Sequence, residues 1–198
     1  MARACDSNSD DLEVISQVLL GKKERFAEIV VRYETRVRGY CRGMLHDEHL
    51  AEDAAQDVFV KAYQRLSSFE GGARFSTWLF RITRNHCIDI FRARSKQVNE
   101  SFDELDSASS NGVLLERSNH GQQVEAREML SKVLLQLTPE HREVLLLREL
   151  QGLSYEEISE VTGTSLDSVK GKLKRIRAQI AQYGRHLSSE VNVNTARR

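Results

Sequence analysis

The chain has 198 residues, of which 40% are hydrophobic and 29% charged, and its formal net charge is zero. It contains a single proline and little strand-like alternation, so the composition predicts an all-α protein of one or two small domains. The start of the chain is polar and acidic, and no apolar run reaches about 18 residues, which argues against a membrane span or a secretory signal.

The three cysteines form no CxxC pair, which favours a reducing, cytoplasmic setting. Cys41 could be drawn together with His46 and His49 as part of a metal site. Their spacing matches no structural zinc pattern, and a fourth ligand is not evident. We therefore predict no metal and no cofactor, with Cys41 as a buried thiol on the apolar face of its helix.

Three helices are predicted before residue 67. Asp10 is expected to cap a short first helix that ends at Gly21, and the second helix is expected over residues 23–45, with apolar residues recurring every three or four positions. The third runs from the 46–48 connection to about Leu66 and buries an alanine-rich face. Its other side carries Asp53, Gln56 and Asp57.

The next predicted helix, over residues 75–96, is strongly basic. It follows a loop at Gly71 and Gly72, and Ser76 is expected to cap it. Residues 74–96 hold six basic side chains against one acidic side chain, interleaved with aromatics. Such a helix suits a nucleic-acid strand whose bases can be unstacked. On this segment alone, a core helix with a solvated basic face is the simpler interpretation.

The periodic pattern fails from about Ser95. Residues 97–116 contain five acidic side chains and no basic one, within a stretch rich in Ser, Asn, Asp and Gly. We predict a flexible linker over residues 96–123 that joins a helical domain of residues 10–95 to a second domain of residues 124–184.

The second domain has clear signals for where its helices begin and end. A helix is expected over residues 124–137, and Thr138 and Pro139 then cap and open the next helix, which ends at Gly152. Two capping boxes, at residues 154–157 and 164–167, flank a turn at Gly163. The last two helices therefore form a predicted helix-turn-helix whose second helix is basic, with the chain fraying after Gly184.

The combination of motifs resembles extracytoplasmic-function (ECF) sigma factors. Residues 53–63 (DAAQDVFVKAY) and 75–85 (FSTWLFRITRN) are similar to sigma region two, and the helix-turn-helix is similar to region four. The resemblance implies two helical domains, a region two bundle and a region four helix-turn-helix. It also implies binding of core RNA polymerase and promoter DNA, and control by an anti-sigma factor.

The resemblance also implies roles for individual residues. The docking surface for the polymerase clamp would be Asp53, Gln56 and Asp57. In region two, Trp78 would support melting of the downstream (−10) element, Asn85 would lie in or beside the pocket for a flipped base, and phosphates would be held by Arg81, Arg84, Arg92 and Arg94. Contacts to the upstream (−35) element would come from Lys170, Gly171, Lys172, Lys174, Arg175 and Arg177.

Two of these assignments stay open at this level. Trp78 also fits the apolar stripe of its helix, so it is either a core aromatic or an exposed one. In the recognition helix, Gly171 occupies a position where the family usually has serine. Lys172 occupies a position where it usually has arginine. Because lysine cannot grip guanine bidentately, the −35 preference of the family does not transfer directly.

Two other classes of protein share part of the pattern. A LuxR-type regulator has a similar helix-turn-helix, although its sensor half is normally α/β. A sigma mimic that only sequesters an anti-sigma factor would not need to keep the basic surfaces. No GxSxG, P-loop or HExxH motif occurs, so the sequence predicts that the protein is not an enzyme.

Overall fold

The computed structural model describes residues 7–102 and 134–195, with side chains for residues 8–94 and 134–182. Every regular element in these residues is a helix, which confirms the all-α prediction. The chain divides into two compact units, each described by itself below. The linker prediction for residues 103–123 and most of the predicted helix over residues 124–137 lie outside the described residues.

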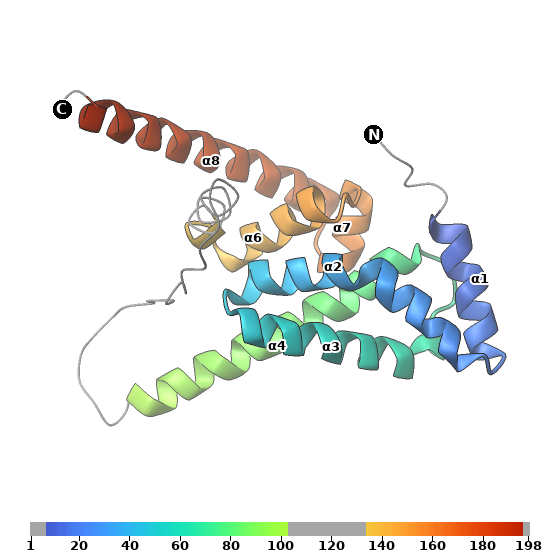
Figure 1. Ribbon diagram of the computed structural model, residues 1–198. Coiled ribbons are helices and arrows are strands. Elements are labelled where there is room, and N and C mark those ends of the chain that lie inside the picture. Colours follow the sequence, from blue (N-terminus) through green and yellow to red (C-terminus); the bar gives the residue numbers. More distant parts are fainter. Residues whose placement is uncertain (1–6, 103–133, 196–198) are drawn as a thin grey trace. The chain divides into compact units, whose positions relative to one another are not determined.

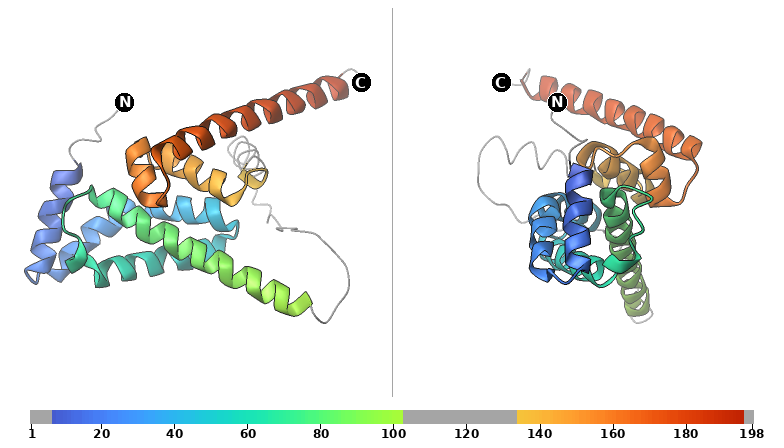
Figure 2. Two further views of the ribbon diagram at one scale, coloured as in Figure 1. Left: turned by 180° about the vertical axis from the view of Figure 1, so that it is seen from behind. Right: turned by 90° about the vertical axis from the view of Figure 1, so that its right-hand side faces the viewer.

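The N-terminal unit is a helical bundle. It consists of α1 (Ser7–Leu19), α2 (Phe26–Leu45), α3 (Glu48–Gln64) and α4 (Phe75–Phe102), with short 3₁₀ turns η1 (Lys23–Arg25) and η2 (Leu66–Ser68). Helices α2, α3 and α4 lie side by side, and the C-terminal end of α4 extends beyond them (Figures 1 and 2). The buried alanines of α3 lack bulky side chains, so α3 can approach its neighbours closely. They are Ala51, Ala54, Ala55 and Ala62.

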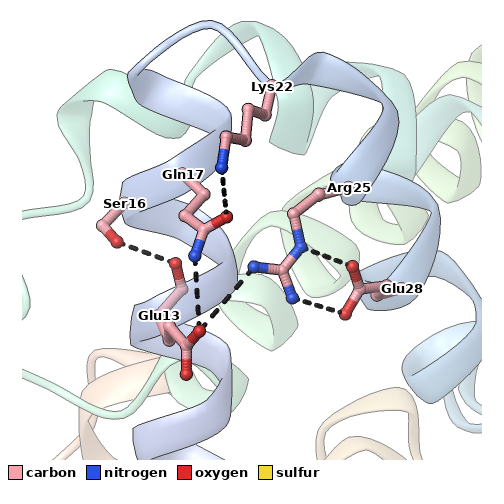
Figure 3. A network of polar contacts seen from close by, with 6 residues as sticks. All are labelled: Glu13, Ser16, Gln17, Lys22, Arg25 and Glu28. Carbon is pink, nitrogen blue, oxygen red and sulfur yellow. Dashed lines mark hydrogen bonds and ion pairs between the residues drawn. The ribbon is translucent and has the colours of Figure 1, made fainter.

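A buried carboxylate joins α1 to α2. Asp11 is 1% exposed and accepts hydrogen bonds from the Tyr33 hydroxyl, at 2.6 Å, and from Arg32. Burial and the Asp11 carboxylate raise the pKa of Tyr33. At the surface, the η1 corner adds a polar network in which Arg25 binds Glu28 and approaches Glu13 (Figure 3). Exposed ion pairs of this kind add little to the stability of the fold individually. The buried Asp11 contacts therefore hold α1 to α2 more strongly than the surface network does.

Two predicted helix starts in this unit are wrong. The first helix begins at Ser7, so Asp10 lies inside it and is not its N-cap. Asn8, in the first turn of this helix, instead binds the start of α4. Its side-chain oxygen accepts a 3.2 Å hydrogen bond from the backbone N–H of Phe75, at the start of α4. The first turn of α4 is thus capped by a residue distant in sequence, whereas Ser76 already lies inside the helix. Cys41 is fully buried, as predicted, with its Sγ 3.6 Å from Cys87 Sγ.

The C-terminal unit contains α6 (Pro139–Leu145), the π-helical turn η3 (Leu146–Leu150), α7 (Tyr155–Thr162) and α8 (Leu166–Thr195). The Thr138 cap, the Ser154–Glu157 capping box and the left-handed Gly163 turn form as predicted. The second box does not form as predicted: α8 begins at Leu166, and Ser165 Oγ accepts from the N–H of Ser168.

The π-helical turn changes which leucines are buried. The sequence pattern predicts one buried face of Val144, Leu145, Leu147 and Leu150. Val144 and Leu147 are buried as predicted, but Leu145 is only half-buried and Leu150 is 48% exposed, while Leu146 is buried instead. A π-turn adds a residue to the helical repeat, so the apolar face shifts its phase at this point.

Both long helices, α4 and α8, extend beyond their predicted C-terminal ends. Helix α4 continues to Phe102, because residues 95–102 contain no glycine or proline to stop it. Helix α8 continues past Gly184 to Thr195. A glycine ends a helix when it takes a left-handed conformation, as Gly152 and Gly163 do, whereas Gly184 lies inside α8.

Candidate functional site

Arg81, Arg84 and Arg92 lie on one side of α4, away from the core. Arg81, Asn85 and Arg92 are exposed, and Arg84 is half-buried and donates to Asn85 Oδ1 at 3.2 Å. The opposite side of the helix is buried in the bundle through Phe75, Leu79, Phe80, Ile82 and Cys87. Burial of that apolar side fixes the rotation of α4 about its axis. The arginine side chains and the Asn85 amide therefore face away from the core.

Trp78 belongs partly to the core and partly to the surface. Its ring packs against those of Phe69 and Phe75, with centroids 5.5 Å apart in each case, and the residue is half-buried. It also lines a cavity of about 200 Å³ together with Arg81 and the loop of residues 68–73. Both interpretations of Trp78 therefore hold in part, since one side of the ring packs and another borders the cavity.

Residues 68–73 are the part of this site that the sequence analysis did not assign. Gly71 and Gly72 were expected only to form a loop, and they do so. The signal that could have drawn attention to them is their position, just before a helix whose first turn carries the chain's one tryptophan. Asn85 is not among the residues that line the cavity; it lies one turn beyond Arg81 on the same face of α4.

Arg94, further along α4 and on a different side of the helix from Arg81, is engaged within the protein. Its guanidinium lies 3.0 Å from Asp47 Oδ2, and both side chains are substantially exposed. Asp47 is also the N-cap of α3, where it accepts from the N–H of Leu50 at 3.0 Å. The Leu50 hydrogen bond, with help from Arg94, lowers the pKa of Asp47.

The side of α3 opposite its alanines carries Asp53, Gln56 and Asp57, all exposed; we call these three residues the acidic face. The neighbouring carboxylate Glu52 is instead paired with Arg38, at 3.4 Å. Val60, one turn from Gln56, is 54% exposed. A carboxylate-rich face with a small apolar neighbour suits a basic protein surface better than nucleic acid.

Asp57 differs from its neighbours because a histidine of α4 lies beneath it. His86 Nε2 is 3.3 Å from Asp57 Oδ2, and His86 Nδ1 is 2.5 Å from Lys61 Nζ. Burial first, and then the charge of Lys61, lower the pKa of His86. The sequence analysis missed His86, because its partners lie on another helix.

The recognition helix α8 divides in the same way as α4. Its core side consists of Val169, Leu173 and Ile176, which are buried. Four of its basic residues are exposed: Lys170, Lys174, Arg175 and Arg177. Gly171 and Lys172 are half-buried. A Cβ at Gly171 would meet only the Arg175 guanidinium, at 3.8 Å. The fold therefore does not require glycine there, and the bare backbone is open to a partner.

The side chains that the structure describes include no candidate metal centre. Nowhere in residues 8–94 and 134–182 do three or more His, Cys, Asp or Glu side chains gather so that they could hold a metal ion. Within the described helices, none combines the length and apolar character that crossing a membrane requires.

Two sequence families match the chain, one in each unit. Residues 29–97 match Sigma-70 region 2, and residues 127–180 match Sigma-70, region 4. The chain is 31% identical to the RNA polymerase sigma-H factor of Pseudomonas aeruginosa, over 88% of this chain and 93% of that protein. It is also 31% identical to the ECF RNA polymerase sigma factor SigW of Bacillus subtilis, over 87% and 96% respectively.

Two solved structures share the fold. CnrH, solved in complex with the cytosolic domain of CnrY, superposes with a TM-score of 0.64 at 25% identity, over 86% of this chain and 94% of that chain. RpoE from Bartonella quintana, solved with the anti-sigma factor NepR, gives the same TM-score and identity over 79% and 94%.

Proposed function

Because the chain belongs to the ECF sigma factors of the sigma-70 family, we propose that its two units divide the work of promoter recognition and opening. The protein acts in transcription initiation, with core RNA polymerase and promoter DNA as its partners. In the proposal, residues 10–95 bind the polymerase and the −10 element, residues 124–184 bind the −35 element, and residues 96–123 link them.

The acidic face would dock on the polymerase. Asp53, Gln56 and Asp57 are exposed together on α3, while the nearby Glu52 is engaged with Arg38. Complementary charge increases association rates and selects against wrong partners, so a basic surface of the polymerase would be recognised by this face.

The basic face of α4 would open the −10 element. Arg81, Arg84, Arg92 and Arg94 would hold phosphates, Trp78 would support the edge of the melted duplex, and Asn85 would bind the edge of an unstacked base. An amide offers both a donor and an acceptor to a base edge. Unstacking a base costs a few kcal/mol, and stacking on an aromatic returns about 1–3 kcal/mol, so no ATP is needed.

Helix α8 would lie in the major groove of the −35 element, as recognition helices of this type do. The contacts would come from Lys170, Gly171, Lys172, Lys174, Arg175 and Arg177. Because lysines act mainly as point charges, we expect phosphate contacts to supply much of the affinity, with a strong dependence on salt.

Two further parts of the proposal concern the regulation of the protein and its location in the cell. CnrH was solved with the cytosolic domain of CnrY, and RpoE with the anti-sigma factor NepR, which supports an anti-sigma factor for this chain as well. The protein would act by binding and not by catalysis, in the cytoplasm, where its polymerase partner works.

One observation carries the proposal for promoter opening: Asn85 is exposed on the basic face of α4, one helical turn from Arg81 and the cavity beside Trp78. Asn85→Ala should therefore weaken open-complex formation by about 1–3 kcal/mol, the usual size of a base-specific pair. Permanganate reactivity of unpaired thymines measures the opening. Gln64→Ala, which removes an exposed amide at the end of α3, is the control and should leave the footprint unchanged. A wild-type footprint for Asn85→Ala would refute the assignment.

A further inference from the structure

His86 connects the two functional helices of the N-terminal unit. It projects from α4 and is 9% exposed, and its ring lies between two α3 side chains that are one turn apart, Asp57 and Lys61. An aspartate and a lysine at this spacing on a helix surface can pair directly. Here the imidazole separates them, with Nδ1 at 2.5 Å from Lys61 Nζ and Nε2 at 3.3 Å from Asp57 Oδ2.

The contacts determine which ring nitrogen carries the proton. A lysine ammonium has donors only, so His86 Nδ1 must accept from Lys61 and must be unprotonated. The proton of the neutral ring is then on Nε2, which is buried and has no well-aligned hydrogen-bond partner within the described residues. Its nearest carboxylate oxygen is Asp57 Oδ2, on a side chain that is 64% exposed and able to turn toward it.

We propose that His86 is a positioning residue for polymerase docking, which holds Asp57 so that one carboxylate oxygen faces the ring and the other faces the partner. The proposal rests on the proposed docking role of the acidic face. His86 itself is too buried to contact the polymerase. Because a buried donor without a partner is costly, the ring favours the Asp57 rotamer that satisfies Nε2.

The same geometry makes the Lys61 contact sensitive to acid. The charged groups acting on the ring are Lys61 and Asp57 from α3 and Asp89 from its own helix, and the pKa of His86 is lowered by burial and Lys61 against the opposing effect of the two carboxylates. A proton added at Nδ1 would face the Lys61 ammonium and break that contact. The Nε2–H stays on the side of Asp57, and the charge of the imidazolium strengthens its pairing with that carboxylate. As the pH falls through the lowered pKa of His86, the Lys61 contact is therefore lost while the Asp57 contact is kept.

Substitution of His86 in the full-length protein tests the proposal through the affinity for core RNA polymerase. His86→Gln keeps both functions, because its amide oxygen can accept from Lys61 while its amide nitrogen donates to Asp57. His86→Leu keeps the bulk and removes both. We expect His86→Leu to bind about tenfold more weakly and His86→Gln to bind within about twofold of the wild type. Any change of affinity with pH that comes from titration of His86 in the wild type should be absent in His86→Gln, which cannot titrate.

Two results would overturn the proposal: wild-type affinity in His86→Leu, or equal losses in the two variants. If His86→Leu does not fold, Lys61→Met becomes the second variant. It removes the donor that fixes the tautomer, and unchanged affinity and an unchanged pH profile in Lys61→Met would also overturn the proposal.

Asp57→Asn distinguishes this inference from the docking proposal on which it rests. Glu52→Gln is its matched control, since it neutralises a carboxylate on the same helix outside the acidic face. Weaker binding by Asp57→Asn, with normal binding by Glu52→Gln and His86→Leu, would reject only the role of His86. Normal binding by Asp57→Asn would reject the Asp57 docking contact itself.

Discussion

Arg94, which lies beyond the other arginines of α4, has two competing partners. It is paired with Asp47 at 3.0 Å, yet the proposed function assigns it to a DNA phosphate. Because the pair is largely exposed, it contributes only about 0.2–1 kcal/mol, which a phosphate contact can replace. If Arg94 binds a phosphate as proposed, Asp47 would lower the affinity of this end of α4 for DNA without abolishing it.

Asp47→Asn tests this competition. Asparagine caps helices as well as aspartate, so α3 should keep its N-cap while Arg94 loses its charged partner. Promoter affinity of the reconstituted holoenzyme should rise by about 0.2–1 kcal/mol, measured by mobility-shift titration at fixed salt. In an Arg94→Ala background the same change should have no effect on affinity. An equal gain in both backgrounds would show that Asp47 does not act through Arg94.

Among the elements, the helices of the C-terminal unit have local boundary signals. Ser154 Oγ accepts from the N–H of Glu157 at 3.1 Å, and Glu157 Oε2 accepts from the N–H of Ser154 at 2.7 Å. These bonds join residues three apart, so they can be predicted from adjacent sequence. They also set the start of α7, the first helix of the helix-turn-helix.

Ser154→Ala should destabilise this element. The loss of the cap should cost about 1 kcal/mol of the free energy of unfolding, measured by circular dichroism during thermal or urea unfolding. Ser154→Thr, which keeps a hydroxyl acceptor, should restore most of it. The fluorescence of Trp78, the only tryptophan, reports on the N-terminal unit in the same samples. Equal stability of Ser154→Ala and the wild type would mean that the box does not stabilise α7.

Comparison of the elements shows what the sequence could predict. Helix identity, the buried alanine face of α3 and the caps at Thr138 and Ser154 followed from local patterns. The start of α4 did not, because its cap comes from Asn8, in another helix. Leu150 was wrongly predicted to be buried and Leu146 was missed, because a π-turn changes the helical phase, which periodicity assumes to be constant.

The candidate site divides in a similar way. The exposed residues of α3, α4 and α8 could be listed from helical spacing and resemblance, since each helix has one apolar face that must be buried. The contacts of His86, the Arg94–Asp47 pair and the cavity beside Trp78 could not, because each depends on how separate segments pack. The functional roles of the exposed residues remain predictions that need the measurements above.

For the whole molecule, the charges are arranged in blocks of opposite sign. The zero net charge combines an acidic α3 face, a basic α4, an acidic linker and a basic α8. Such an arrangement suits a protein that must meet several partners in one assembly. The linker acids, with side chains outside the described residues, are predicted to enter the polymerase cleft in place of nucleic-acid charge.

Replacement of the five linker acids by serine tests that prediction. The residues are Glu100, which lies in the last turn of α4, and Asp103, Glu104, Asp106 and Glu116. Transcript yield should fall because the linker would lose its electrostatic attraction to a basic cleft, while binding of the isolated promoter −35 element should be unaffected. A yield equal to that of the wild type would remove the charge-mimic role.

Run-off transcription with purified core RNA polymerase tests the central claim most directly. The protein should direct a transcript from a promoter that carries its −35 and −10 elements, selected from a randomised promoter library. Core polymerase alone should give none from the same templates. Failure to initiate from any promoter in the library, by a protein that is folded and binds an anti-sigma factor, would contradict the claim and indicate a sigma mimic instead.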